Sequence, residues 1–265
     1  VVELSPGVNV HHLDAGHDLH WTKEQVPAHF KELSTEFKKA LSGDRRYDLI
    51  HSHYWLSGKV AMPVAKELKL QLVHTMHTMA RVKNLSLAEG EIPEPMIRVQ
   101  GETQIVAAAS ALTANTDAEA ASLVSLYEAC PDIVHVVTPG VDLYNFTPGA
   151  GRAAARKVIG IDSDALVISF VGRIQPHKGT ELLIRAISEL VSHSPQLRPK
   201  LRVFIVGGAS GANSSEVERL KELVTWLGID DVISFSPPVV RAELPNWYRA
   251  SDLVCVPSYS ESFGL

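Results

Sequence analysis

The sequence predicts an α/β protein of two domains, each built on a parallel β-sheet covered by helices. Three observations support this prediction. Apolar runs of strand length alternate with amphipathic stretches of helix length along nearly the whole chain. The alternation stops at a stretch rich in Pro and Gly, residues 138–149, and then starts again. The length of 265 residues is enough for two domains.

Repeated strand–helix units favour parallel sheets, so we expect two Rossmann-like domains at residues 1–145 and 146–265. In the first domain the strand-like runs are residues 8–13, 47–51, 71–74, 111–115 and 133–137. The helical stretches between them are residues 22–41, 56–68, 95–109 and 117–127. Thr22 followed by Gln25 fits a capping box, which predicts that the first helix begins there.

The second domain repeats the pattern. Its strand-like runs are residues 166–171, 201–207, 232–235 and 253–257. Its helical stretches are residues 152–159, 180–192, 216–227 and 243–250. The chain begins without Met and stops in what reads as a loop entering a helix. We therefore expect it to be a piece of a longer protein, with both domains incomplete.

Composition narrows the class of partner. The net charge is −5 and the pI is about 6.2, so no overall basic field favours nucleic acid or an anionic membrane. An anionic ligand must then be held by local positive groups. Cys130 and Cys255 lie far apart in sequence and read as reduced thiols. With no signal peptide and no long apolar run, we expect a cytoplasmic enzyme or binding protein.

In doubly wound sheets the ligand lies beyond the carboxyl ends of the strands, so the residues that follow each strand are the candidates for chemistry. Arg173 and Lys178 flank a tight turn with Pro176 just before a helix, where they could meet a diphosphate. Glu261 follows the last strand, and its carboxylate suits sugar hydroxyls. The alternative is that all three are solvated surface charges.

Four histidines also follow strands. His51 and His53 share one face of a strand, and His74 and His77 follow the neighbouring strand. Such a set raises the alternative of a zinc or dinuclear hydrolase. Against it, the second pair lacks regular ligand spacing, and no acidic or thiol ligand lies directly beside either pair. We favour histidines that are hydrogen-bonded in the interior or line a cleft.

Four motifs together resemble a known family. Residues 172–179 (GRIQPHKG) and 257–265 (PSYSESFGL) resemble the Arg…Lys turn and the opening of the E-x7-E motif in retaining GT-B glycosyltransferases of the GT4 family. Residues 48–58 (DLIHSHYWLSG) and 74–84 (HTMHTMARVKN) are similar to the branch that glycosylates inositol phosphate. The resemblance covers essentially the whole chain. The first-domain motifs are the more specific pair.

The resemblance implies a retaining transfer of N-acetylglucosamine from UDP-GlcNAc to 1D-myo-inositol 3-phosphate, the first step of mycothiol biosynthesis. Arg173 and Lys178 would neutralise the diphosphate of the departing UDP. Glu261 would bind hydroxyls of the donor sugar, and His77 would lie at the reacting sugar. Val239 would meet the uracil, although some members carry Arg there.

For the acceptor, the resemblance implies a phosphate site made of Lys23, Tyr54, Thr78 and Arg98. Two cations and two hydroxyls are what a phosphate monoester needs. The four residues come from four separate predicted elements, so no local rule brings them together. The first domain would therefore bind the acceptor and the second the nucleotide sugar.

The resemblance also implies motifs that fall outside this sequence, an optional metal ion and an oligomeric state. The first strand with its Gly-rich loop would precede Val1, and the second Glu of E-x7-E would follow Leu265. No cofactor is required by the expected chemistry. An optional Mg²⁺ would lie near the backbone of Tyr248, Arg249 and Ser251. A homodimer is compatible with the resemblance.

The expected mechanism is same-face attack, because no second carboxylate lies beside Glu261 or His77 to act as a nucleophile. The protein would then act by positioning the acceptor and stabilising leaving-group charge. Three alternatives stay open: a related transferase with another acceptor, such as a sucrose-phosphate-synthase-like enzyme; a histidine-ligated, metal-dependent hydrolase; and a non-catalytic nucleotide-sugar-binding protein.

Overall fold

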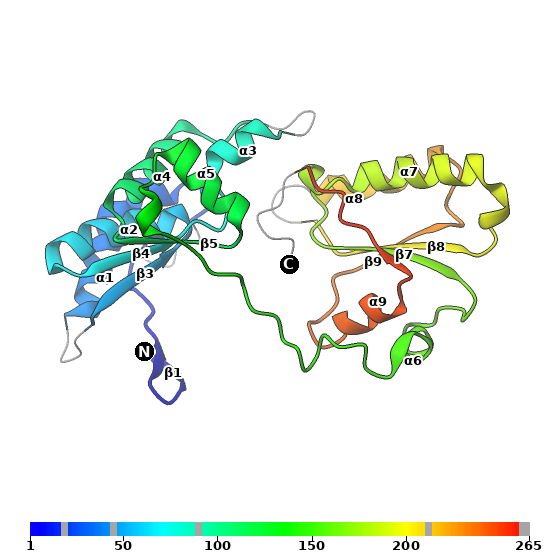
Figure 1. Cartoon of the computed structure of the whole chain (residues 1–265), viewed down its shortest axis with the longest axis horizontal. Helices are drawn as coiled ribbons and strands as arrows, with labels where there is room; N and C mark the ends of the chain where they lie inside the picture. The colour runs from blue at the N-terminus through cyan, green and yellow to red at the C-terminus, as the bar shows by residue number, and fades with distance from the viewer. Residues whose placement is uncertain (17–20, 43–46, 88–91, 210–213, 260–265) are drawn as a thin grey trace. The chain divides into compact units, whose positions relative to one another are not determined.

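The computed structural model describes residues 1–16, 21–42, 47–87, 92–209 and 214–259 (Figure 1). The chain separates into two compact units. The first consists of Val1–Leu85 and Ile92–Pro139, and the main part of the second is Gly140–Leu265. The break lies between Pro139 and Gly140, inside the Pro- and Gly-rich stretch of the sequence. Each unit contains a four-stranded parallel sheet, which confirms the predicted α/β class.

The sheet of the first unit contains four parallel strands. In order across the sheet they are β3 (Leu49–His53), β4 (Gln71–Thr75), β5 (Ala111–Ala114) and β6 (Val134–Val136). Helices α2 (Tyr54–Leu68), α4 (Met96–Ala108) and α5 (Asp117–Tyr127) lie on one face of it (Figure 1). Leu72, Leu112 and Leu123 are buried between sheet and helices. Alternate strand residues therefore face this core, and the others face away.

The first helix is shorter than the sequence predicts. Residues 26–29 form the 3₁₀ helix η1 (Val26–His29), and α1 follows as Phe30–Leu41. An α-helix that began at Thr22 would need the Pro27 N–H to bond the Lys23 carbonyl oxygen, and proline has no such N–H, which agrees with a later start. The predicted cap exists without its helix: the Thr22 backbone N–H donates to Gln25 Oε1 at 2.9 Å. The short helix α3 (Ala80–Leu85) was not predicted.

The run at residues 8–13 is not a strand of the parallel sheet. Only β2 (Val8–Val10) forms, and it pairs antiparallel with β1 (Val2–Ser5) through a turn at Gly7. Gly7 has a φ of +80°, a conformation that favours glycine. None of residues 8–13 is buried, so this apolar run lacks the core that the sequence pattern implied.

The second unit repeats the parallel arrangement. Across its sheet the strands are β10 (Leu253–Val254), β7 (Leu166–Val171), β8 (Leu201–Val206) and β9 (Ile233–Ser236). Helices α7 (Thr180–His193) and α8 (Ser214–Trp226) cover one face, and α6 (Gly151–Ile159) and α9 (Leu244–Ala250) cover the other (Figure 1). Ile184, Val203, Ile205 and Leu220 centre the core of this unit.

Three further 3₁₀ turns complete the elements: η2 (Pro131–Ile133), η3 (Pro176–Lys178) and η4 (Pro195–Leu197). Each begins with Pro, whose fixed φ suits the first position of a turn. In the described part of the chain, none of the helices has the length and apolar character needed to span a bilayer.

Candidate active site

The candidate site of the first unit lies where β3 and β4 end. His53 and Thr75 are register partners, so the residues that follow them, Tyr54 and His77, lie beyond one edge of the sheet. Both have left-handed backbone, with φ of +68° for Tyr54 and +60° for His77. The other two non-glycine residues of this kind in the described ranges, Lys69 and Glu128, cap helix ends. Left-handed non-glycine residues that are not C-terminal helix caps often mark functional sites.

The four histidines divide between the two faces of the sheet. His53 Nδ1 lies 2.9 Å from His77 Nε2, and His51 Nε2 lies 2.8 Å from Thr75 Oγ1. His74 points the opposite way, into the core, where its Nδ1 lies 2.7 Å from the Ser52 hydroxyl. The described residues contain no group of three or more His, Cys, Asp or Glu side chains suited to a metal ion. Because His74 faces the core, the four histidines do not form one ligand set.

The histidine environment favours neutral imidazoles. Burial, and then the neighbouring His53, lower the pKa of His77. Burial and the charges of His53 and His77 lower the pKa of His51 in the same way. For His74, which is fully buried, burial lowers the pKa to about 4. At neutral pH, His51, His74 and His77 are therefore uncharged and can serve as both donors and acceptors.

Two of the predicted acceptor residues, Tyr54 and Thr78, lie beside a third, Arg98. Its Nη2 donates to the Thr78 hydroxyl at 2.8 Å and to the Thr78 carbonyl oxygen at 3.1 Å. Its guanidinium carbon lies 5.1 Å from the centre of the Tyr54 ring, over the ring face. Lys23 is not part of this group. It pairs with Glu24 at 3.6 Å on the surface, and within the described ranges no hydrogen bond joins it to the hydroxyls of Tyr54 or Thr78.

Arg98 is more buried than its expected role suggests. Its side chain is 3% exposed and forms ion pairs with Glu102, at 2.7 Å, and with Glu94, at 2.9 Å. Burial opposes its charged form, but the two carboxylates outweigh burial and raise the pKa of the guanidinium. Burial likewise opposes ionisation of Glu94, and Lys83 and Arg98 outweigh it, so the pKa of Glu94 is lowered. The positive charge of Arg98 is thus largely compensated by protein groups.

A hydrogen-bond network behind this site was missed from the sequence. Glu102, on α4, is fully buried and accepts from Arg98 Nε, from the Ala80 backbone N–H at 2.9 Å and from the Tyr127 hydroxyl. The Tyr127 oxygen accepts in turn from the Arg81 backbone N–H at 3.0 Å. The i,i+4 spacing of Arg98 and Glu102 was the available signal for one of these contacts. Nothing in the sequence indicates the contact with Tyr127.

The candidate donor site of the second unit lies where β7, β8 and β10 end. Arg173 is exposed two residues after β7, and Lys178 ends η3 just before α7. The Tyr259 backbone N–H donates to the His177 carbonyl oxygen at 2.9 Å, which joins the loop after β10 to this turn. The Thr180 hydroxyl, at the start of α7, is buried and has no hydrogen-bond partner in the described part of the chain.

Two glycines, Gly179 and Gly207, allow the loops that follow β7, β8 and β10 to pack closely on one another. Gly179 has a φ of +68°, and a Cβ there would lie 2.1 Å from the Pro257 carbonyl oxygen. Gly207 has a φ of +151°, and a Cβ there would lie 1.8 Å from the Gly172 carbonyl oxygen. Side chains at either position would push the loops apart. The sequence therefore requires glycine where the candidate diphosphate turn packs on its neighbours.

The other predicted donor and metal residues have different surroundings. Val239 is half-buried in the loop between β9 and α9, and Glu261 lies outside the described residues. Arg249 donates to the carbonyl oxygens of Asn145, at 2.5 Å, and Thr147, at 2.6 Å. The Ser251 hydroxyl donates to Trp247 and Ser169 oxygens, while burial raises the pKa of Tyr248. These side chains offer no carboxylate to a magnesium ion, and an optional Mg²⁺ on the backbone of this segment stays a prediction.

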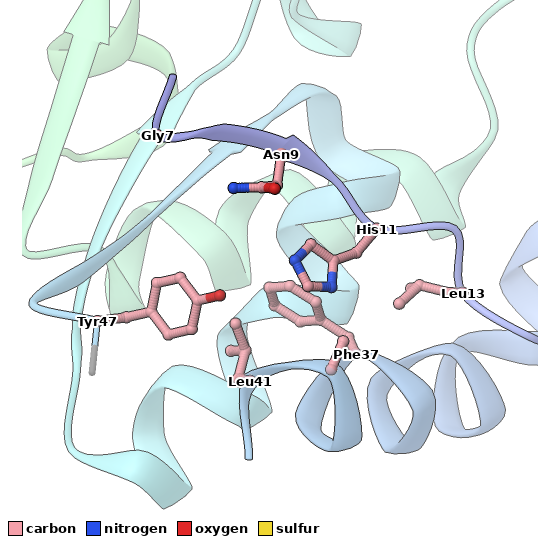
Figure 2. Close-up of a pocket in the computed structure, with 8 residues that line it drawn as sticks. Gly7, Asn9, His11, Leu13, Phe37, Leu41 and Tyr47 are labelled. Carbon is pink, nitrogen blue, oxygen red and sulfur yellow. The ribbon is translucent and has the colours of Figure 1, made fainter. Parts of the chain in front are cut away.

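Of two pockets, one lies beside a predicted site and one lies away from the predicted site residues. One of about 490 Å³ lies beside the candidate donor turn, lined by Gln175, Gly179, Thr180 and charged residues of α7 and α8. The other, of about 420 Å³, lies in the first unit (Figure 2). There Asn9 and His11 face Phe37 and Leu41 of α1. None of its lining residues is a predicted site residue.

Comparison with known sequences establishes the class of protein. Residues 2–140 match the glycosyl transferase 4-like domain, and residues 151–265 match glycosyl transferases group 1. The structure of sucrose-phosphate synthase from Thermosynechococcus elongatus superposes with a TM-score of 0.87 at 26% identity, over 100% of this chain and 63% of that one. Anabaena HepE in complex with UDP and glucose gives 0.71 at 20% identity, over 93% and 61%. The chain therefore belongs to the GT4-like glycosyltransferases, with the GT-B fold.

Within this family, the chain is similar to enzymes named D-inositol 3-phosphate glycosyltransferase. The one from Streptomyces bingchenggensis is 50% identical over 100% of this chain and 58% of its own length. The one from Kineococcus radiotolerans is 49% identical over 100% and 61%. The chain thus spans about three fifths of the length of these relatives. Their similarity extends through both units.

Proposed function

We propose that the full-length protein is a retaining glycosyltransferase that moves N-acetylglucosamine from UDP-GlcNAc to 1D-myo-inositol 3-phosphate in the cytoplasm. The observation that carries this proposal is the identity of about 50% over the whole chain to enzymes named for that acceptor. In the proposal the first unit binds the acceptor and the second binds the nucleotide sugar. No metal ion is needed.

The Arg98 group supports a phosphate-bearing acceptor. A guanidinium has five N–H donors, and four of those on Arg98 have partners in Glu94, Glu102 and Thr78 in the described part of the chain. The remaining Nη1 donor, with the hydroxyls of Thr78 and Tyr54, can meet phosphate oxygens. Lys23, on an exposed turn, would supply the second cation by moving onto the bound phosphate. Arg98 then serves the acceptor partly through Thr78, whose hydroxyl it orients.

The donor half of the reaction needs positive charge at the leaving group. Arg173, after β7, and Lys178, just before α7, would neutralise the diphosphate of the departing UDP, and the N-terminus of α7 would add to their effect. His77 would lie at the reacting sugar. Because its pKa is lowered, its neutral imidazole would not repel the positive charge that develops at the anomeric carbon. A phosphate oxygen of UDP would take the proton of the attacking inositol hydroxyl.

The experiment is UDP release by the full-length protein supplied with UDP-GlcNAc and one acceptor at a time. We expect turnover with inositol 3-phosphate, much less with inositol, and an α-linked product by NMR, since retention preserves the α-configuration of the donor. A β-linked product would overturn the retaining mechanism. Absence of release with every acceptor would favour a nucleotide-sugar-binding protein.

A second candidate is a sucrose-phosphate-synthase-like enzyme, favoured by the TM-score of 0.87 with that structure. The same assay includes fructose 6-phosphate as acceptor and UDP-glucose as donor. Faster turnover with this pair than with UDP-GlcNAc and inositol 3-phosphate would establish the second candidate in place of the first.

A further inference from the structure

The turn that carries His77 and Thr78 is held from behind by one carboxylate. The turn runs from the end of β4 into α3 and contains the left-handed His77. Its backbone N–H groups at Ala80 and Arg81 are bonded by Glu102 Oε2 and by the Tyr127 oxygen, at 2.9 and 3.0 Å. Such a conformation persists when surrounding contacts determine it.

Glu102 connects every one of these contacts. Its Oε1 accepts from Arg98 Nε at 2.7 Å, and Arg98 in turn donates to both oxygens of Thr78. Its Oε2 accepts from the Ala80 N–H and from the Tyr127 hydroxyl, which bonds Arg81. The carboxylate is fully buried, so it cannot itself touch a substrate from solvent. An ionised carboxylate only accepts hydrogen bonds, and all three groups that Glu102 faces, on Arg98, Ala80 and Tyr127, are donors.

We propose that Glu102 is a positioning residue, which fixes the His77–Thr78 turn so that both side chains meet the reacting sugar and the acceptor phosphate. This role rests on the proposed function, in which those two residues act on the substrates. Tyr127 acts together with Glu102, because its hydroxyl joins Glu102 to the far end of the turn. We call these two residues the positioning device. The device acts on both substrates' reacting groups and leaves the UDP diphosphate site in the second unit untouched.

The sharpest variant is Glu102→Gln. An amide keeps the shape but replaces one acceptor by an NH₂ group, which must then face Arg98 Nε–H or the Ala80 and Tyr127 donors. The matched control is Glu119→Gln, on α5 of the same unit. Glu119 is also buried and accepts from one backbone N–H, that of Asn115 at 2.6 Å, and in the described part of the chain none of its hydrogen bonds reaches the turn.

For full-length Glu102→Gln we expect kcat to fall about 10- to 100-fold and the KM for inositol 3-phosphate to rise. The Kd for UDP should stay within about twofold of wild type, because misplaced reacting groups weaken catalysis more than donor binding. Tyr127→Phe, the milder variant if Glu102→Gln folds poorly, should lose about three- to tenfold. The two losses should be less than additive in the double variant. Glu119→Gln should keep wild-type kinetics.

Hydrogen exchange supplies a readout independent of turnover. The backbone amides of Ala80 and Arg81 should exchange faster in Glu102→Gln and Tyr127→Phe than in wild type. In Glu119→Gln their exchange rates should equal those of wild type. Unaltered exchange at both amides, or altered exchange with wild-type kcat and KM, would overturn the positioning role. Equal losses in Glu102→Gln and Glu119→Gln would do so too. Inactivity of the wild-type enzyme on UDP-GlcNAc and inositol 3-phosphate would instead refute the proposed function.

Discussion

His74 shows how one buried residue can dictate the pH dependence of a unit. Its imidazole lies in the core against Gly58 and Ile105, and Ser52 is its hydrogen-bond partner on Nδ1. Its Nε2 is buried and has no partner among the described residues. A proton added there would be a charge in an apolar core, and for this reason the pKa of His74 falls to about 4.

This arrangement predicts acid sensitivity. An unfolded histidine takes up a proton below about pH 6.5, and the folded one only near pH 4, so the unfolded state binds more protons in that window and stability falls as the pH drops. His74 alone should lower the free energy of unfolding by about 2 kcal/mol between pH 7 and pH 5. Urea denaturation at both pH values checks this. The loss should be clearly smaller in His74→Gln, and an equal loss in both proteins would contradict the assignment.

Arg98 gives the second prediction at this scale. Removing its guanidinium leaves the fully buried Glu102 without a charged partner, which typically costs about 3–5 kcal/mol, whereas the half-buried Glu94 keeps Lys83. Arg98→Gln should therefore lose stability as well as acceptor use. Arg98→Lys keeps the charge but cannot bond Glu94, Glu102 and Thr78 together.

The measurement compares both variants by thermal unfolding and by kcat/KM for inositol 3-phosphate. We expect Arg98→Lys to be the more stable of the two and still to lose at least about tenfold in kcat/KM, because Thr78 is no longer oriented. Wild-type kinetics in a folded Arg98→Lys would show that its directional hydrogen bonds have no part in acceptor use.

At the scale of elements, the sequence predicted what depends on local pattern. Residues 166–171 and 117–127 were assigned to their strand and helix with the observed bounds, because apolar periodicity is a local signal. The assignment of residues 8–13 to a strand of the parallel sheet was wrong, because an apolar pattern alone does not specify which strand it pairs with. The gathering of Tyr54, Thr78 and Arg98 came only from family resemblance, and the Glu102–Tyr127 bond joins residues 25 positions apart with no pattern to reveal it.

The donor turn supplies the prediction at this scale. Gly179→Ala adds a methyl group that would lie 2.1 Å from the Pro257 carbonyl oxygen, besides the strain of its φ of +68°. Gly160→Ala is the matched control, with a φ of +72° and open space around the added methyl. Gly179→Ala should be less stable than this control by about 1–3 kcal/mol, the usual range for overpacking.

Calorimetry with UDP completes the comparison. The Kd for UDP should rise in Gly179→Ala, because the turn carrying Arg173 and Lys178 is displaced, and stay unchanged in Gly160→Ala. Equal stability and equal UDP affinity in the two variants would mean that the Pro257 loop moves aside without consequence.

At the scale of the whole molecule, the two candidate sites belong to different units, each with its own core. The net charge of −5 means that neither anionic substrate is drawn by an overall field, so each relies on its own cations. The proposed division of labour between the units therefore predicts that substitutions in one leave the ligand affinity of the other intact.

Arg173→Ala and Lys178→Ala test this division. Each should weaken UDP binding by about 10- to 100-fold, since a charged hydrogen bond contributes about 1.5–3 kcal/mol. The KM for inositol 3-phosphate should change little at saturating donor. Unchanged UDP affinity in both variants would identify them as ordinary surface charges. Arg202→Ala, in β8, is a cationic control that should bind UDP normally.

The left-handed backbone at Tyr54 and His77 also sets limits on how these positions can evolve. A β-branched residue is strongly disfavoured at such φ values, whereas Gly, Asn and Asp adopt them readily. Selection for folding alone would therefore drift both positions toward small or amide side chains, away from an aromatic and an imidazole. Retention of Tyr and His in a lineage would then record selection on chemistry, and their joint replacement by Gly or Asn would mark a descendant that kept the fold and abandoned the reaction.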